Sequence, residues 1–103
     1  MVYRLNVSDR AEADLDRILS YITENLAAPK AASDLADEVY ACYDRLEENP
    51  FLYEECRDPR LKAAGYRRAV IKNYILLYKI YEDTNEVIVH RFFYGSQNYT
   101  DLI

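Results

Sequence analysis

The sequence predicts an α+β fold, in which a short strand and an antiparallel helical hairpin precede a three-strand antiparallel meander. The apolar residues follow a helical period over residues 9–48, and three later segments are rich in Tyr, Val, Ile and Phe. Only short polar links separate the periodic segments. A chain of 103 residues, 50% hydrophobic and 30% charged, fits one globular domain spanning residues 1–103.

The first segment, residues 2–7, alternates between two sides. Tyr3, Leu5 and Val7 fall on one side and Val2, Arg4 and Asn6 on the other. A period of two residues is typical of a half-buried strand. We therefore expect the chain to open with a strand.

Two helices are expected next. Ser8 and Asp9 are N-cap candidates, and the first helix is predicted from about Asp9 to about Leu26. Its apolar stripe is Ala11, Leu15, Ile18, Ile22 and Leu26. The second helix is predicted from Pro29 to Glu48, with the stripe Ala32, Leu35, Val39, Cys42 or Tyr43, and Leu46. Since only about three residues join the helices, they must turn back on each other.

The second half of the chain predicts the sheet. After an irregular stretch, residues 50–65, the strands are expected at residues 66–71, 74–81 and 86–94. The middle strand is mostly apolar on both faces, so it is expected to be central and covered on both sides. The helical hairpin supplies one cover, and the terminal residues 99–103 are the nearest candidate for part of the other.

Composition narrows the functional classes. No apolar run approaches the roughly 18 residues of a membrane span, and no leader peptide is visible, so we expect cytoplasmic residence. Cys42 and Cys56 lack metal-ligand spacing and are expected to be free thiols rather than a disulfide. No metal or other cofactor is expected.

Charge is distributed unevenly along the chain. The net charge is −5, but residues 1–56 carry 5 Lys/Arg against 13 Asp/Glu, whereas residues 57–103 carry 8 against 5. This asymmetry suits a basic partner on one face and an acidic partner on another. The alternative is that the acidic helices only keep the protein soluble.

Basic and tyrosine side chains gather in the predicted sheet. They are Arg67, Arg68, Lys72, Lys79 and Arg91, with Tyr66, Tyr74, Tyr94 and Tyr99. Cations hold phosphates and tyrosines stack on bases, so a surface that reads or cleaves RNA is one interpretation. The other is solvated cations and packed tyrosines. Arg67 and Arg68 are adjacent on a strand, so they are predicted to point to opposite faces.

The same alternation predicts that His90 and Arg91 lie on opposite faces of the last strand. His90 is then either a packed residue or a base near pH 7. Arg91 shares a face with apolar residues, so it must reach an edge or pair with an acid or a ligand. Catalytic triads, metal-ligand clusters and Gly-rich phosphate loops do not occur in the sequence.

The order of these segments resembles the RelE/ParE superfamily of toxins from type II toxin–antitoxin modules. The resemblance is carried by YRLNVSDRAEADLDRILSYI, by Glu48-Asn49-Pro50 at the end of the second helix, by Tyr66-Arg67-Arg68, by NYILLYKIYEDTNEVIVHRFFYG and by the tail NYTDLI. It covers essentially the whole chain. It implies a growth-inhibiting toxin, of the kind linked to plasmid stabilization, that forms a heteromeric complex with a cognate antitoxin.

The resemblance also implies one of two targets. RelE-like members cleave mRNA on the ribosome, and ParE-like members inhibit DNA gyrase. The nuclease pattern has an arginine after the aromatic that opens the middle strand and a basic residue after the last strand, where this chain has Ile75 and Gln97. The ParE-like tail pattern is also incomplete, since of its conserved positions only Gly95 is kept after the last strand.

We therefore expect a ParE-like toxin that binds and inhibits a target such as DNA gyrase. The residues expected to bind the target or the antitoxin are Arg67, Arg68, Arg91, Tyr94 and Tyr99. The alternative is a ribosome-dependent endoribonuclease that uses Arg68, Lys72, Arg91 and Tyr99.

Overall fold

The computed structural model describes residues 2–95 and confirms the predicted α+β fold. Its elements, in chain order, are β1 (Arg4–Val7), α1 (Asp9–Ser20), a π-helical turn (Tyr21–Asn25), α2 (Pro29–Glu48), a 3-10 turn (Pro50–Leu52), α3 (Pro59–Ala63), β2 (Tyr66–Ile71), β3 (Tyr74–Tyr81), a second 3-10 turn (Glu82–Thr84) and β4 (Glu86–Tyr94). The three strands of the meander have the predicted bounds. The short helix α3 lies in the stretch that was predicted to be irregular.

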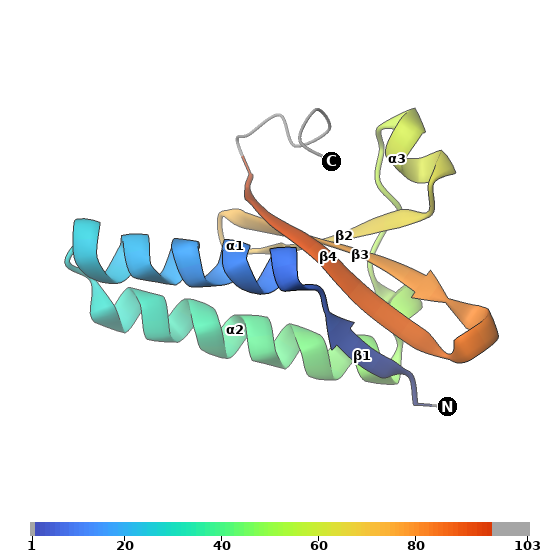
Figure 1. Ribbon diagram of the computed structural model, residues 1–103, viewed down its shortest axis with the longest axis horizontal. Helices are drawn as coiled ribbons and strands as arrows, with labels where there is room; N and C mark the ends of the chain where they lie inside the picture. Colours follow the sequence, from blue (N-terminus) through green and yellow to red (C-terminus); the bar gives the residue numbers. More distant parts are fainter. Residues whose placement is uncertain (1, 96–103) are drawn as a thin grey trace.

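The four strands form one sheet in the order β1-β4-β3-β2. The pairs β2–β3 and β3–β4 are antiparallel, whereas β1 pairs with β4 in parallel, with Arg4 opposite Glu86 and Val7 opposite Val89. The strand nearest the N-terminus therefore lies beside the last strand of the meander. Figure 1 shows the antiparallel helices α1 and α2 on one side of the sheet and α3 on the other.

Two apolar layers hold these elements together. The larger layer lies between the hairpin and the inner face of the sheet, and includes Leu35, Val39, Leu46, Leu76 and Tyr78. The smaller layer lies on the outer face and consists of Cys56, Leu61, Ile75, Leu77 and Phe93, with Tyr66 packed against it. The central strand is thus covered on both faces, as predicted. The predicted contribution of residues 99–103 to this cover lies outside the described residues.

The first helix ends differently from the prediction. The regular helix α1 stops at Ser20, and a π-helical turn continues to Asn25. A π turn is wider than an α turn, so it shifts the residues that follow off the helical stripe. Ile22 stays buried, but Leu26 is 57% exposed and drops out of the predicted core.

A β-bulge in β4 corrects one prediction. Tyr78 pairs with Val89 while Leu77 pairs with Arg91, so His90 is an extra residue without a partner on β3. Val89 faces the hairpin layer, whereas the guanidinium of Arg91 lies 4.6 Å from the ring centroid of Phe93 in the outer layer. The ring of His90 also faces outward, against Tyr66. The prediction that His90 and Arg91 lie on opposite faces is therefore wrong.

Candidate functional site

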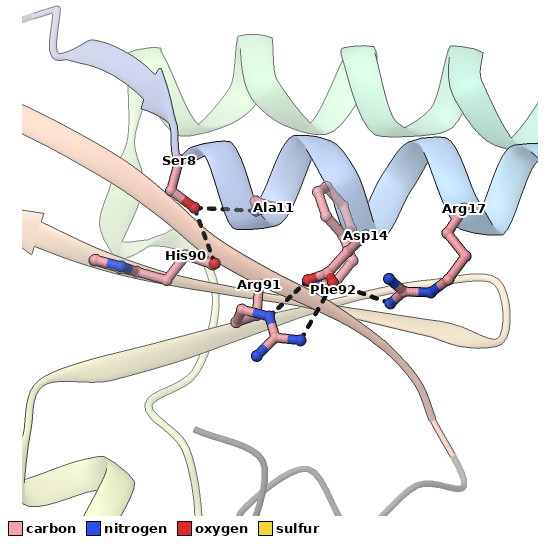
Figure 2. A network of polar contacts seen from close by, with 7 residues as sticks. All are labelled: Ser8, Ala11, Asp14, Arg17, His90, Arg91 and Phe92. Carbon is pink, nitrogen blue, oxygen red and sulfur yellow. Dashed lines mark hydrogen bonds and ion pairs between the residues drawn. The ribbon is translucent and has the colours of Figure 1, made fainter.

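Arg91 is held by a buried carboxylate, Asp14 of α1. The Nε of Arg91 donates to Oδ2 of Asp14 at 2.7 Å, and its Nη2 donates to Oδ1 at 3.2 Å. The two side chains are 14% and 4% exposed. Asp14 also accepts the backbone N–H of Phe92 at 3.0 Å and Nη2 of Arg17 at 3.0 Å (Figure 2). Of the predicted alternatives for Arg91, pairing with an acid is therefore confirmed.

This network exists because β1 is shorter than β4. The strand β1 ends at Val7, and beyond it residues at the start of α1 form hydrogen bonds with the backbone groups of β4 that have no strand beside them. The Ser8 hydroxyl donates to the carbonyl of His90 at 3.0 Å and accepts the N–H of Ala11 at 3.1 Å as the N-cap of α1. The Asp14 carboxylate accepts a hydrogen bond from the backbone N–H of Phe92, two residues further along β4. Ser8 and Asp14, from the N-cap and the second turn of α1, thus form the hydrogen bonds that a longer β1 would otherwise form with β4.

The protonation state of Asp14 follows from these contacts. Burial by itself raises its pKa, but the hydrogen bonds from Arg91, Phe92 and Arg17 outweigh burial and hold the pKa below its ordinary value of 3.8. The carboxylate is therefore ionised at neutral pH, and it neutralises the guanidinium of Arg91.

His90 belongs to an aromatic cluster on the outer face. Its Nε2 lies 3.1 Å from the hydroxyl of Tyr81, and its ring meets that of Tyr66 edge to face at 5.6 Å. The ammonium of Lys79 sits 4.4 Å from the centroid of the Tyr66 ring. Burial, and to a smaller extent the charge of Lys79, lowers the pKa of His90 below 6.5, so the ring is neutral at pH 7.

Arg67 and Arg68 diverge as predicted. On the inner face, Nη1 of Arg67 donates to the carbonyl of Tyr53 at 2.7 Å, and its guanidinium lies 5.2 Å from the Phe51 ring centroid. Arg68 faces outward, opposite Leu77. The contacts of Arg67 stabilise the loop before α3, which gives this side chain a structural role.

Arg68, Lys72 and Tyr94 come together around a hollow of about 430 Å³ at the β2–β3 turn. The amide of Gly95 donates to the carbonyl of Asn73 at 2.7 Å, which fixes the end of β4 beside that turn. Tyr94 is 46% exposed, and its ring packs edge to face on Tyr74. Arg68 and Tyr94 belong to the predicted binding set and Lys72 to the nuclease alternative, and the structure brings these three residues together. Tyr99 lies outside the described residues.

Asp14 is the functional residue that the sequence reasoning overlooked. It follows Ala11 by three residues and precedes Ile18 by four, which places it on the apolar stripe of the first helix. A carboxylate on a buried stripe requires a partner. That position was the available signal for the Arg91 pair.

Other classes of site find no support in residues 2–95. Groups of three or more His, Cys, Asp or Glu side chains that could hold a metal ion do not occur there. No helix in this part of the chain is long and apolar enough to cross a membrane. Both cysteines are free, as predicted, and the structure shows that both are also buried.

Comparisons with known proteins agree with this architecture. The family model of the ParE toxin of the type II toxin–antitoxin system parDE matches residues 5–99. No curated protein sequence matches the chain.

Solved structures give the same fold. One chain of the chromosomal ParDE system from P. aeruginosa is 18% identical and superposes with a TM-score of 0.71, covering 90% of this chain and 96% of that one. One chain of the RelBE2 complex from Mycobacterium tuberculosis is also 18% identical, with a TM-score of 0.62 and coverage of 91% and 99%. One chain of an archaeal RelE–RelB complex from Pyrococcus horikoshii is 15% identical and superposes with a TM-score of 0.61, covering 94% of this chain and 99% of that one.

Coverage of residues 5–99 by one family model decides the classification, and the four-strand sheet with its helical hairpin is the fold shared with these structures. The chain belongs to the ParE toxin family of type II toxin–antitoxin systems.

Proposed function

We propose that this protein is a cytoplasmic toxin that acts by binding a protein target such as DNA gyrase, and that a cognate antitoxin neutralises it in a heteromeric complex. The observation that carries the binding mode is the Asp14–Arg91 pair. The ParE toxin family of the protein, and the toxin–antitoxin complexes among its structural neighbours, support the antitoxin as partner.

The Asp14–Arg91 pair argues against the nuclease alternative, because the positive charge of Arg91 is already balanced by a carboxylate. A nuclease needs cations that are available to stabilise the charge developing on a phosphate. The guanidinium of Arg91 is instead neutralised by a carboxylate that is 4% exposed, and releasing it would leave that buried carboxylate with the largely exposed Arg17 as its cationic partner among residues 2–95. Arg91 therefore serves the fold better than it serves phosphate chemistry. The net charge of −5 also favours a protein target over ribosomal RNA.

One observation supports the endoribonuclease as second candidate. Arg68, Lys72 and Gly95 line the same hollow, and Tyr99 follows Gly95 by four residues in the sequence. This arrangement provides two cations for a phosphate and a nearby tyrosine in the sequence. A RelE-like reaction would rely on these residues without Arg91.

The deciding experiment compares two activities of the purified protein. We expect inhibition of gyrase supercoiling and no specific cleavage of a defined message in a translation extract. The matched control is Arg57→Ala/Lys62→Ala, which makes the same charge change on exposed residues away from the hollow. The nuclease would be established instead by cleavage that the control variant keeps and Arg68→Ala/Lys72→Ala loses. Arg91→Ala is a poor probe of catalysis, because it also removes half of a buried ion pair.

Expression without an antitoxin provides the cellular test. We expect growth to stop, and co-expression of the antitoxin to restore it. Unimpaired growth at high expression would contradict the toxin assignment for this chain and favour a purely binding role.

A further inference from the structure

A small groove on the hairpin side of the molecule is not used by any role described so far. It has a volume of about 190 Å³ and lies where α1, α2 and β1 meet. Its walls are apolar and aromatic, from Val7, Leu15, Tyr40 and Tyr43, and the carboxylates of Glu12 and Asp16 complete its lining. Ligand pockets for small molecules usually measure roughly 300–1,000 Å³, so this groove has the size of a single side chain.

The aromatic wall of the groove is accessible. Tyr40 is 56% exposed although it is a large aromatic residue, and its ring meets that of Tyr43 edge to face at 6.0 Å. Burial above all, with smaller effects from neighbours that include Glu12, raises the pKa of Tyr43, so its hydroxyl stays protonated and neutral. The groove thus presents π faces to solvent without an added negative charge from the tyrosines.

The two acidic residues lie on the same side of α1, and no ion pair to either of them occurs within residues 2–95. Glu12 and Asp16 are four residues apart on α1, which places them on one side of the helix. By helical spacing, Asp37 and Asp44 flank Tyr40 on α2 and extend the acidic surface.

None of the five basic residues of residues 1–56 lines the groove. Arg4 pairs with Glu86, and Arg10 lines a different hollow, beside Arg91. Arg17 binds Asp14, Lys30 pairs with Asp34 and Arg45 donates to the hydroxyl of Tyr53. Residues 1–56 carry 13 Asp/Glu against 5 Lys/Arg, so the field around the groove is negative. Charge complementarity therefore calls for a cation from outside the chain.

We propose that this groove binds an arginine side chain carried by a basic segment of the antitoxin. A guanidinium is planar, stacks on an aromatic face and can donate hydrogen bonds to two carboxylates at once, so it matches Tyr40 together with Glu12 and Asp16 better than an ammonium does. The identity of the partner rests on the proposed function, whereas the preference for a guanidinium rests on the groove alone.

The groove is tested first with a defined probe. Nα-acetylarginine methylamide is titrated into the protein at low salt, and the ring resonances of Tyr40 and Tyr43 are followed by NMR. We expect saturable shifts at both rings, and no response to the norleucine analogue. Glu12→Gln/Asp16→Asn should raise Kd at least tenfold, equivalent to about 1.4 kcal/mol. Equal binding by this variant and the wild type, or equal binding of norleucine, would overturn the proposal.

A matched variant controls for general charge. Glu24→Gln/Glu48→Gln removes the same number of charges from exposed positions of the hairpin outside the groove. We expect it to bind the arginine probe like the wild type. A loss equal to that of Glu12→Gln/Asp16→Asn would mean that only the net charge matters, and the groove would no longer be a site.

The partner is tested separately, with the purified protein encoded by the reading frame adjoining this gene. We expect Glu12→Gln/Asp16→Asn to keep growth inhibition and to weaken the complex at least tenfold, more at 50 mM than at 500 mM salt. Unchanged affinity despite a positive arginine titration would refute the antitoxin as occupant. Failure of the wild type to arrest growth would refute the proposed function and leave the arginine titration as an independent result.

Discussion

Asp14→Ala is expected to be the most damaging single substitution in the polar network of β4. It removes the two carboxylate oxygens of Asp14 that accept from the Arg91 guanidinium, one of which also accepts the Phe92 N–H. Breaking one side of a buried ion pair costs about 3–5 kcal/mol. Because the Arg91 side chain is 14% exposed and can gain some hydration, we expect the lower end, about 3 kcal/mol. That is a large part of the roughly 5–15 kcal/mol that keeps a domain folded.

The measurement is urea denaturation followed by circular dichroism. The slope m of the unfolding free energy against urea concentration should be the same in the variant and the wild type, which checks the two-state assumption. The loss should lower Tm by roughly 12 °C or more at this chain length. Arg17→Ala is the matched control, because it removes a bond to the same carboxylate from a side chain that is 67% exposed, at a cost of about 0.5 kcal/mol. Equal losses for Asp14→Ala and Arg17→Ala would refute the assignment of Asp14–Arg91 as the structural ion pair.

The pH dependence gives a second readout of the same prediction. The folded state lowers the pKa of Asp14, so its contribution is present above the ordinary value of 3.8 and is lost as pH falls through the lower folded pKa. Asp14→Asn can still accept the Phe92 N–H but carries no charge. The stability gap between the wild type and Asp14→Asn should be largest near neutral pH and should shrink below about pH 4. A gap that stays constant down to pH 2 would show that charge is not the cause.

Three further outcomes follow from other parts of the fold. Lys72 has a φ of 53°, a conformation that costs a non-glycine residue about 1 kcal/mol, so Lys72→Gly should raise Tm, and a fall would contradict this. The buried hydroxyl of Tyr78 donates to the carbonyl of Pro50 at 2.7 Å, so Tyr78→Phe should cost about 1–3 kcal/mol in chemical denaturation; a change under about 0.5 kcal/mol would mean that water replaces the bond. Cys42 and Cys56 are 0% and 1% exposed and burial raises the pKa of both thiols, so Ellman's reagent should modify them quickly only in denaturant, and rapid reaction of the native protein would contradict their burial.

The bulge at His90 changes what the outer face offers. It places His90 and Arg91 on the same face, beside a hollow of about 330 Å³ that Ser8, Asp9, Arg10 and Tyr66 also line. Proximity alone does not make these two residues a catalytic pair. His90 contacts Tyr81 and Arg91 is bound by Asp14, so each is held by a different element.

Local patterns were sufficient for most of the secondary structure. The aromatic and β-branched content of residues 66–71 and 74–81, together with the polar links beside them, predicted β2 and β3 with their observed bounds. Successive side chains of an unbroken strand point to opposite faces, so their direction follows from position alone. The same rule correctly separated Arg67 from Arg68. It failed after Val89, since a bulge is decided by the fit between two strands and has no fixed signal within one of them.

Periodicity, turn residues and segment order were enough to predict the α+β class, the helical hairpin, the three-strand meander and the resemblance to the toxin superfamily. Three features could be seen only in the folded chain: β1 pairs with β4 in parallel, Asp14 accepts the Phe92 N–H at the edge of β4, and Glu12 and Asp16 line an aromatic groove. Each of these joins residues far apart in the chain, and their contacts depend on how helices, strands and charges pack together. The candidate roles of Arg91 and of the acidic hairpin follow from that packing.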